Sequence, residues 1–276
     1  MKQSRPITPG RRQYQVVDYS GLNRTEPYKP LLRRVKKHSG RNSAGLITVR
    51  HRGGGVRRMM REIEFSQPSQ PGPIKGKVET LEYDPLRTAF ISLVLWQNGR
   101  RSYILAPQKL SVGDEIVWGE SAPLQTGNRM RLKAMPVGTI VHNIEIRPFG
   151  GGRIARSAGS WAEVMAHEGI YTLLRMPSGE IRRVLVDGFA SIGQVSNAEQ
   201  HLVSLGKAGR VRGMGIRPTV RGSAMNPRDH PYGGGEGRTQ RGTRKPKTKW
   251  GKVTGGRKTR KKKKWSNPFI VSRRKK

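Results

Sequence analysis

Six histidines are the candidates for acid–base chemistry in this chain: His38, His51, His142, His167, His201 and His230. An imidazole titrates near neutral pH, so it can move protons when a neighbouring group orients it. His230 follows Asp229 and is a weak catalytic candidate, because the Asp-His-Pro sequence has no nucleophile near it. His142 alternates with isoleucines, which predicts a satisfied core histidine, whereas His51 lies among arginines and is predicted to contact phosphate.

No established catalytic or metal-binding motif appears in the sequence. It has no GxxxxGK[ST] for a nucleotide, no HExxH for zinc and no GxSxG for a nucleophile. It also has no cysteine, which excludes disulfides, thiolate catalysis and cysteine-based zinc sites and favours an intracellular protein over a secreted one. We therefore predict a protein that is not an enzyme, has no catalytic residue, holds no metal and uses no cofactor.

The charge balance indicates an anionic partner. Lys and Arg number 55 against 18 Asp and Glu, which gives a formal net charge of +37. Self-repulsion of this size opposes a compact fold unless a polyanion neutralises it. A membrane surface is the alternative to nucleic acid, but the longest apolar run, 89–96, is far too short to span a bilayer. Nucleic acid is the favoured partner, and we expect no membrane association.

The stretch 222–238, GSAMNPRDHPYGGGEGR, is predicted to form neither a helix nor an interior strand. Its two prolines remove backbone donors, while its glycines allow backbone angles that other residues avoid. Constraints of both kinds around Asn226 and His230 indicate a shaped loop rather than a flexible spacer. Arginines at 221, 228 and 238 indicate that this loop faces phosphate.

Two other glycine runs have the same design. Gly53 to Gly55 follow a predicted strand at 46–49 and are surrounded by arginines, so their N–H groups can approach a phosphate backbone. A solvated basic loop is the alternative for this segment. The run FGGGRIARSAG at 149–159 is interpreted as a second phosphate-facing loop, and 206–221 as an extended arm without periodicity.

The elements that position these loops are predicted to be short strands. Apolar and β-branched runs at 78–83, 89–96, 102–106 and 115–118 predict one small barrel, with a hairpin turn at Asn98-Gly99. Runs at 138–146, 171–176 and 181–186 predict a second β unit, after a connection over 127–136. A short helix or turn is expected at 198–206, and 67–73 has the composition of a linker.

Charge divides the chain in the same places. Residues 1–78 carry a net +14, residues 79–187 only +2, and residues 188–276 carry +21. From 238 to 276, 18 of 39 residues are basic and none is acidic, which predicts disorder for that tail in isolation. Trp250, Trp265 and Phe269 are interleaved with this charge, and such aromatics can stack on exposed bases or pack into grooves.

Four motifs carry a resemblance to a known family: GRNSAGLITVRHRGGG at 40–55, RIARSAG at 153–159, GKAGR at 206–210 and SAMNPRDHPYGGGEGR at 223–238. They are similar to the universal large-subunit ribosomal protein L-two family in its bacterial-type form, from about residue 8 to residue 271. The resemblance implies an OB-type five-stranded barrel followed by an SH3-like barrel, with long basic irregular extensions. It also implies primary rRNA binding, subunit joining, and a glycine-rich loop near the peptidyl transferase centre.

With this resemblance we predict four segments. They are a basic N-terminal extension (1–74), the OB-type RNA-binding barrel (75–126, or from near residue 40), the SH3-like barrel (127–197) and a basic C-terminal extension with the glycine-rich loop (198–276). The sequence departs from the usual family pattern at Val56 and Arg57, at Arg228, and at Tyr232, where a second histidine is common. Only His230 therefore inherits the contested family proposal of a direct part in peptidyl transfer.

The predicted rRNA-binding residues share a basic, glycine-flanked or aromatic setting. They are Arg41, Arg50, His51, Arg52, Gly53, Gly54, Gly55, Arg57, Arg58, Arg61, Arg153, Arg156, Ser157, Lys207, Arg210, Arg212, Arg217, Arg221, Met225, Asn226, Arg228, His230, Tyr232, Gly233, Gly234, Gly235, Arg238, Trp250, Arg257, Lys258 and Arg260.

The expected partners are large-subunit rRNA, small-subunit rRNA at an intersubunit bridge, and neighbouring ribosomal proteins. Structural Mg²⁺ would be held by the RNA, and no homo-oligomer is expected. The implied location is the cytoplasmic ribosome of a bacterium or the ribosome of a mitochondrion or plastid. Catalysis by His230 and generic DNA compaction are the competing hypotheses, and shaped loops argue against compaction because it requires only charge.

Overall fold

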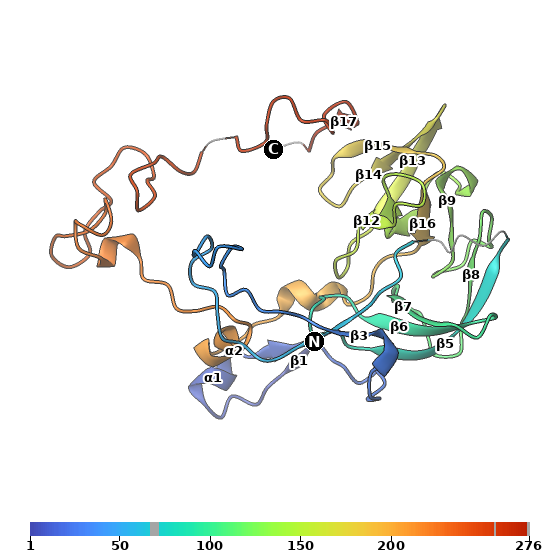
Figure 1. The fold of residues 1–276 in the computed structure, drawn as a ribbon, viewed down its shortest axis with the longest axis horizontal. Coiled ribbons are helices and arrows are strands. Elements are labelled where there is room, and N and C mark those ends of the chain that lie inside the picture. The colour runs from blue at the N-terminus through green and yellow to red at the C-terminus, as the bar shows by residue number, and fades with distance from the viewer. Residues whose placement is uncertain (67–71, 257, 275–276) are drawn as a thin grey trace. The chain divides into compact units, whose positions relative to one another are not determined.

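The chain divides into two compact units in the computed structural model, which describes residues 1–66, 72–256 and 258–274. The barrel unit comprises 1–36, 57–208 and the residues from 266 onward. The loop unit comprises 37–56 and 209–265. Strands are concentrated in the barrel unit, so the chain is mainly β (Figure 1). No helix in the described ranges is long and apolar enough to cross a membrane.

The first barrel is built on a long central strand. Strand β5 (Ile74–Glu82) pairs antiparallel with β6 (Ile91–Trp96) on one side and with β8 (Glu115–Trp118) on the other. Strand β7 (Arg101–Leu105) pairs with β6, and a bridge from Ile63 to Tyr103 adds the preceding chain to this edge. Alternating side chains from these strands fill the interior, as period-2 patterning requires. The four strands predicted here are confirmed.

The hairpin predicted at Asn98-Gly99 is confirmed, but its turn is of a different type. The Trp96 N–H donates to the Arg100 carbonyl at 2.9 Å, so the loop has three residues rather than two. Only Gly99 has a positive φ, at +76°. The loop is therefore a type I turn closed by one left-handed glycine. Pro177-Ser178-Gly179 forms the same turn between Met176 and Glu180.

The second barrel uses more strands than the sequence pattern predicted. Its sheet runs in the order β15 (Ile181–Leu185), β14 (Tyr171–Arg175), β13 (Ala162–Glu168), β10 (Ile140–His142), β16 (Phe189–Ile192) and β9 (Arg129–Arg131). Strand β9 and the 3-10 helix η2 (Leu132–Ala134) lie in the segment predicted as a connection, and Met130, Leu132 and Met135 are core residues. That prediction was wrong because basic residues on either side hide the apolar positions.

The strand predicted over 138–146 is interrupted at Asn143. This residue has a φ of +48°, a left-handed angle that stops β10 and starts the short strand β11 (Ile144–Glu145). β11 pairs with β12 (Gly152–Ile154) instead of the main sheet. His142, on the barrel side of the break, is buried and its Nδ1 lies 2.8 Å from the Gly193 carbonyl. The prediction of a satisfied core histidine is confirmed.

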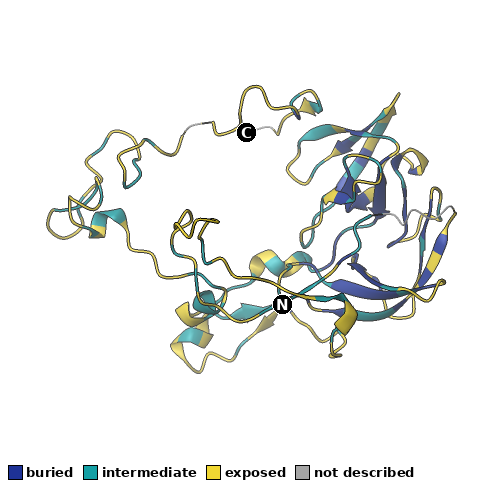
Figure 2. Cartoon of the chain, viewed as in Figure 1, coloured by how far each residue is buried: buried dark blue, intermediate teal, exposed yellow. Residues whose placement is uncertain are grey.

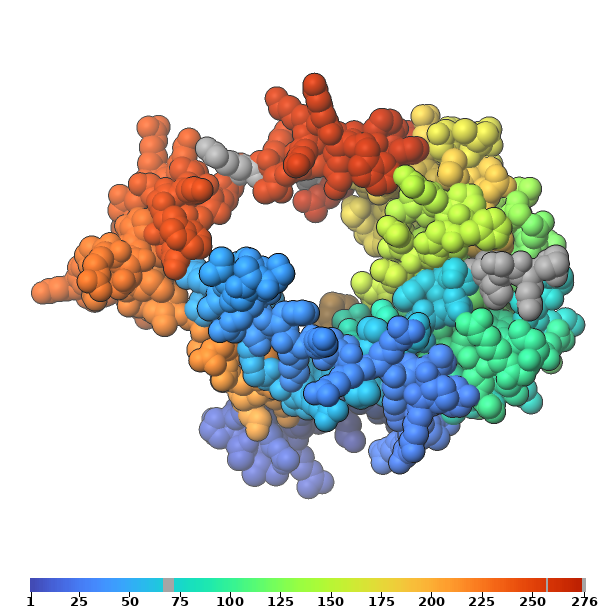
Figure 3. Space-filling view, in the orientation of Figure 1, coloured from blue at the N-terminus to red at the C-terminus, as the bar shows by residue number. Residues whose placement is uncertain are grey.

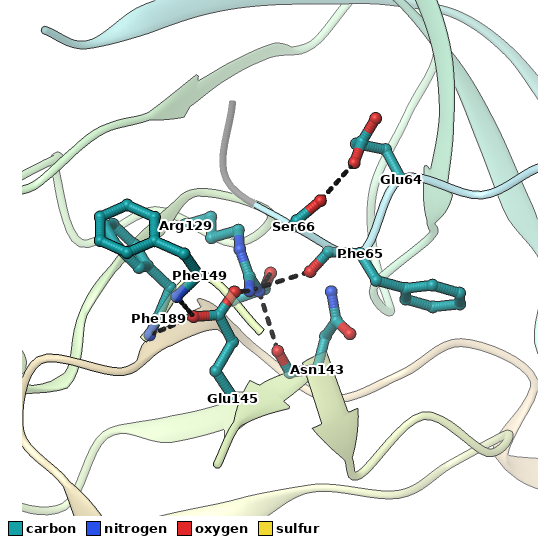
Figure 4. A network of polar contacts seen from close by, with 9 residues as sticks. Glu64, Phe65, Ser66, Arg129, Asn143, Glu145, Phe149 and Phe189 are labelled. Atoms are coloured by element: carbon teal, nitrogen blue, oxygen red, sulfur yellow. Dashed lines mark hydrogen bonds and ion pairs between the residues drawn. The ribbon is translucent and has the colours of Figure 1, made fainter. Parts of the chain in front are cut away.

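A buried ion pair in the second barrel also contacts the chain that precedes the first barrel. Arg129 is 0% exposed and donates to the Glu145 carboxylate at 2.8 Å, to the Asn143 carbonyl at 2.8 Å and to the Phe65 carbonyl at 3.1 Å (Figure 4). Burial lowers the pKa of Arg129, and the charge of Glu145 acts against that shift. Glu145 also accepts backbone N–H groups of Phe149 and Phe189. Arg129 thus holds the chain before the first barrel against the second barrel.

The end of the chain returns to the second barrel. Strand β17 (Ile270–Ser272) pairs antiparallel with β15, and the Arg183 N–H donates to the Phe269 carbonyl at 2.8 Å (Figures 1 and 3). The Phe269 ring meets Tyr171 edge-to-face with centroids 6.1 Å apart. Phe269 therefore packs on protein, although its basic surroundings predicted a contact with bases or with a groove.

The remaining helices and strands of the described chain are short. They are β1 (Lys2–Gln3), α1 (Pro9–Arg12), β2 (Gln15–Val16), the 3-10 helix η1 (Lys29–Leu31), β3 (Leu32–Arg34), β4 (Met59–Arg61), the 3-10 helix η3 (Ala198–Leu202), α2 (Ala208–Gly213) and the 3-10 helix η4 (Gly222–Ala224). The helical turn expected at 198–206 is confirmed by η3. The extended arm expected from 206 was wrong, since α2 occupies its first part. The predicted linker at 67–73 lies mostly outside the described residues.

Candidate nucleic-acid interface

The loop unit has almost no core of its own. None of its described residues is buried, and Figure 2 shows its ribbon in the colours of exposed and intermediate residues. Its sequence contains 23 Lys and Arg against two acidic residues, Asp229 and Glu236. Carboxylates within the loop unit therefore cannot neutralise it, and a polyanionic partner must do so.

The first part of the loop unit is a tight hairpin-like loop rather than the predicted strand at 46–49. The Leu46 N–H donates to Asn42 Oδ1 at 2.9 Å, and the Asn42 N–H donates to the Leu46 carbonyl at 3.0 Å. This Asn-based turn competes with strand pairing because the side chain supplies the hydrogen bond that a neighbouring strand would supply. Leu46 and Ile47 remain largely exposed beside Arg41.

The first triple glycine packs against a second glycine-containing turn. The Gly53 N–H donates to the Gly215 carbonyl at 3.0 Å, and the Val56 N–H donates to the Gly213 carbonyl at 2.9 Å. A Cβ at Gly55 would come within 2.8 Å of the Gly215 nitrogen. The Arg217 N–H donates to the His51 carbonyl at 3.0 Å, which completes the contact. The glycines allow two main-chain segments to lie close together, and Arg52 and Arg217 belong to these segments.

The late glycine-rich stretch is a folded loop that begins with η4. The stretch 222–238 was predicted to form neither a helix nor an interior strand, and η4, a single 3-10 turn, is its one helical element. Beyond it, the Gly234 N–H donates to the Met225 carbonyl at 3.1 Å and the Gly233 N–H to the His230 carbonyl at 2.9 Å. A Cβ at Gly233 would lie 2.2 Å from the Asn226 carbonyl oxygen, so only glycine fits there.

His230 and Tyr232 form the centre of this loop. Their ring centroids are 4.7 Å apart, and a Cβ at Gly222 would lie 2.6 Å from the His230 ring. His230 Nδ1 accepts the Tyr232 N–H at 3.1 Å. The Tyr232 hydroxyl accepts the Lys247 N–H, and the Arg241 guanidinium lies 5.8 Å from the Tyr232 ring. Tyr232 thus fastens the loop to the chain that follows it. An imidazole at this position is shorter than a phenol and would reach that chain less well.

Two cations lie near the ring of an exposed tryptophan in the loop unit. Trp250 is 69% exposed, with the Arg50 guanidinium 5.6 Å and the Lys249 ammonium 4.8 Å from the ring centroid. Cation–π attraction of this kind holds the ring while leaving area open for another flat group. Arg50 and Trp250 are 200 positions apart in the sequence, and the fold brings these two predicted residues together.

The second triple glycine has a packing role inside the barrel unit. A Cβ at Gly152 would lie 2.0 Å from Asn143 Oδ1, and the Gly152 N–H donates to the Phe65 carbonyl at 2.8 Å. These glycines therefore allow close contact between protein segments. The sequence pattern predicted them instead as part of a phosphate-facing loop at 149–159. The arginine that follows, Arg156, lies 4.6 Å from the Phe65 ring.

Arg87 belongs to the same cluster, and sequence reasoning missed it. Its guanidinium lies 5.2 Å from the Phe65 ring and 3.3 Å from the buried Asp84 carboxylate. Burial and then the positive charge of Arg156 lower the pKa of Arg87, while Asp84 raises it. The adjacent Asp84-Pro85 turn was the available signal, since a turn next to an arginine can present it at a surface.

The structure distributes the remaining predicted residues between the two units. The barrel unit holds Arg57, Arg58, Arg61, Arg153, Arg156, Ser157 and Lys207. The loop unit holds Arg41, Arg50, His51, Arg52, Gly53, Gly54, Gly55, Arg210, Arg212, Arg217, Arg221, Met225, Asn226, Arg228, His230, Tyr232, Gly233, Gly234, Gly235, Arg238, Trp250, Lys258 and Arg260. Arg257 lies outside the described residues. Within the described ranges, no group of three or more His, Asp and Glu side chains is placed to hold a metal ion.

Family models account for most of the chain. Residues 28–118 match the model described as Ribosomal Proteins L2, RNA binding N-terminal domain, and residues 125–251 match Ribosomal Proteins L2, C-terminal domain. The chain belongs to the ribosomal L2 family. It is a structural, RNA-binding protein of the ribosome, and rRNA is its partner. The predicted fold class, an OB-type barrel followed by an SH3-like barrel, is confirmed.

Proposed function

We propose that this L2 protein is a primary binder of large-subunit rRNA, in which the barrels dock on folded RNA and the loop unit fills crevices between RNA helices. One observation carries the proposal: the loop unit has a shaped backbone, no buried described residue and 23 basic residues against two acidic ones. A shape with so little internal burial requires an external surface for stability, and the charge identifies that surface as polyanionic.

In the assembled ribosome the protein would support subunit association, tRNA binding and the peptidyl transferase centre. Small-subunit rRNA at an intersubunit bridge and neighbouring ribosomal proteins would be its further partners, and it would act as a single copy. Structural Mg²⁺ would belong to the RNA. Support for these finer roles comes from family membership together with the shaped loop around His230.

The dependence of rRNA affinity on salt tests the first part of the proposal. Replacing Arg50, Arg52, Arg217 and Arg221 with alanine removes four cations from the loop unit. Raising the salt from about 50 to 200 mM weakens rRNA binding. In a variant that lacks four phosphate contacts, this weakening should be roughly a hundredfold smaller than in the wild type. Filter binding or fluorescence titration of an rRNA fragment measures both slopes.

A matched variant places the same charge change in the barrel unit. Arg33, Arg101, Arg175 and Arg183 already pair with Glu62, Glu79, Glu163 and Glu168. Their replacement by alanine should leave the salt slope nearly unchanged, since these cations release few counterions on binding RNA. Equal slopes for the two variants would contradict the proposal that the loop unit makes the phosphate contacts.

We further propose that the protein is not an enzyme. His230 Nδ1 accepts a backbone N–H, so the neutral ring carries its proton on Nε2 and has its basic nitrogen occupied. No hydrogen bond joins the Asp229 carboxylate to this ring in the described part of the chain. We expect His230→Ala ribosomes that assemble to transfer peptides at a normal rate across pH. A large, pH-dependent loss in fully assembled particles would favour catalysis instead.

A further inference from the structure

A small cavity in the barrel unit lies outside every residue assigned so far to rRNA binding. It has a volume of about 220 Å³. Its apolar lining comes from Leu22, Leu81, Phe90, Ala106, Pro107 and Leu110, and its polar lining from Asp18, Gln108, Lys109, Ser196 and Asn197, with Gly21 at the edge. Cavities for drug-sized ligands measure about 300–1,000 Å³, so this one suits a smaller flat group.

Hydrogen bonds hold the walls of this cavity in place. Asn23 and Leu81 exchange two hydrogen bonds of 2.9 Å, which fasten the segment 18–23 to strand β5. On the opposite wall, the Phe90 N–H donates to Ser196 Oγ at 3.2 Å and the Ser196 N–H donates to the Ala106 carbonyl at 3.0 Å. The cavity is thus formed before any ligand enters, which reduces the ordering cost of binding.

One buried acceptor in the lining has no partner. Asn197 Oδ1 is inaccessible to solvent and makes no hydrogen bond within the described structure. Its Nδ2 donates to the Thr88 carbonyl at 2.6 Å and to Gln200 Oε1 at 3.1 Å, so the amide cannot turn over without losing both. The Asn197 side chain is therefore a fixed part of the cavity wall, and the carboxylate of Asp18, which is exposed, is the acceptor that a ligand can reach.

The same lining contains a carboxylate and two strained residues. Asp18 Oδ1 accepts the Ser20 N–H at 3.0 Å, and the serine hydrogen bonds lower the pKa of Asp18, so the group is an ionised acceptor at neutral pH. Lys109 has a φ of +68° and Asn197 a φ of +62°, angles that non-glycine residues rarely adopt. Such backbone strain concentrates where a side chain must be aimed at a ligand.

We infer that this cavity binds one unpaired nucleobase of rRNA that carries an exocyclic amino group. Apolar side chains accept the flat faces of the base, and the Asp18 carboxylate accepts a hydrogen bond from its edge. Lys109, exposed at the rim, suits the phosphate of the same nucleotide. Adenine, cytosine and guanine carry an amino group and uracil does not, so uracil should bind more weakly. The inference rests on the proposed rRNA function and adds a base-reading site to it.

Nucleosides test the inference directly because they carry no phosphate. The full chain, labelled with ¹⁵N, would be titrated in moderate salt with adenosine, cytidine, uridine and inorganic phosphate. We expect adenosine and cytidine at millimolar concentration to shift the amide signals of residues 106, 108–110 and 196–197, and uridine to bind several-fold more weakly. Equal shifts from uridine, or the same shifts from inorganic phosphate, would overturn the inference.

Two variants localise the effect. Gly21 lines the cavity, and a Cβ there would meet no atom within 4 Å, so Gly21→Leu can be accommodated without a clash and should block ligand entry and remove the shifts. Gly209→Leu is the matched control, because Gly209 also has open space and no positive φ and does not line the cavity. Asp18→Asn keeps the size but replaces an acceptor with an amide, and should narrow the preference for cytidine over uridine.

Two further measurements separate this inference from its alternatives. If Gly21→Leu abolishes the nucleoside shifts and leaves the salt slope of rRNA binding intact, the base site exists and the phosphate contacts are independent of it. If the nucleosides cause no shifts but the salt slope of rRNA binding is intact, only the base site is contradicted. In assembled large subunits, Ser20→p-benzoylphenylalanine should give an adduct with RNA, whereas an adduct with a neighbouring protein would show a protein side chain in the cavity.

Discussion

The two units of this L2 protein use the same residue types in opposite ways. In the barrel unit, Trp118 is buried and Arg129 is 0% exposed in an ion pair. In the loop unit, Trp250 is 69% exposed, and 23 cations share two carboxylates. Residue type alone therefore does not separate structural residues from RNA-binding residues. Structural residues find their interaction partner within the chain, whereas RNA-binding residues do not.

Glycine shows the same division at closer range. Gly152 lets two segments of the barrel unit touch, with the nearby Phe65 carbonyl as its hydrogen-bond partner. Gly233 does the same within the loop around Asn226, where neither side of the contact is buried. Both units therefore have specified backbone shapes, but only the barrel unit covers its shape with apolar side chains. Substitutions should then cost folding stability in one unit and RNA affinity in the other.

Removing the buried arginine should give the largest effect. Arg129→Ala leaves Glu145 charged and buried without its cation, and two carbonyls without their donor. We therefore expect a loss of about 3–5 kcal/mol in the free energy of unfolding, measured by chemical denaturation. The double variant Arg129→Met with Glu145→Gln removes the unpaired charge and should recover much of it. In the loop unit, Arg52→Ala should change unfolding by less than about 0.5 kcal/mol. Equal losses for Arg129→Ala and Arg52→Ala would break the comparison.

Arg129 also shows where sequence reasoning stops. Its neighbours in the run Asn128 to Arg131 give the pattern of a surface connection, and its partner Glu145 lies on another strand. By contrast, the first barrel was predictable, because the alternation in β5 to β8 and the Asn98-Gly99 turn are local signals. Strand β13 was missed since Ala162–Glu168 contains few β-branched residues, and its strand form depends on pairing with β10 and β14.

The functional loops were predictable by type but not by contact. Three glycine runs beside arginines indicated shaped basic loops, and the family motifs named their class of partner. The sequence does not show that Gly55 meets Gly215 or that Arg50 reaches Trp250, because long-range contacts leave no periodic trace. The contact of Arg87 with Phe65 and the cavity beside Asn197 were missed for the same reason.

The dependence of folding stability on pH should also distinguish the two units. Burial lowers the pKa of His142 to about 4 from 6.5, so the unfolded chain binds more protons between these values. Stability from the neutral ring is therefore full above about pH 6.5 and is lost as the pH falls toward 4, by about 3 kcal/mol in total. His142→Gln keeps a donor for the Gly193 carbonyl without titrating, so its unfolding free energy should fall less over this window. Asn226→Ala, in the loop unit, changes no titrating group, so its unfolding free energy should follow the wild-type pH profile.

The exposed tryptophan gives the smallest of these effects and the sharpest test of the loop unit. If Trp250 stacks on a base, Trp250→Ala should weaken binding to an rRNA fragment by about 1–3 kcal/mol, with Trp250→Phe in between. The salt slope should stay the same, since no charge is removed, which distinguishes stacking from the arginine contacts. Unfolding of the barrels should not change, whereas Trp118→Phe should lower stability and leave affinity intact. A Trp250→Ala variant with normal affinity would mean that Arg50 and Lys249 hold the ring only to shape the loop, and the loop unit would then bind RNA through charge and backbone alone.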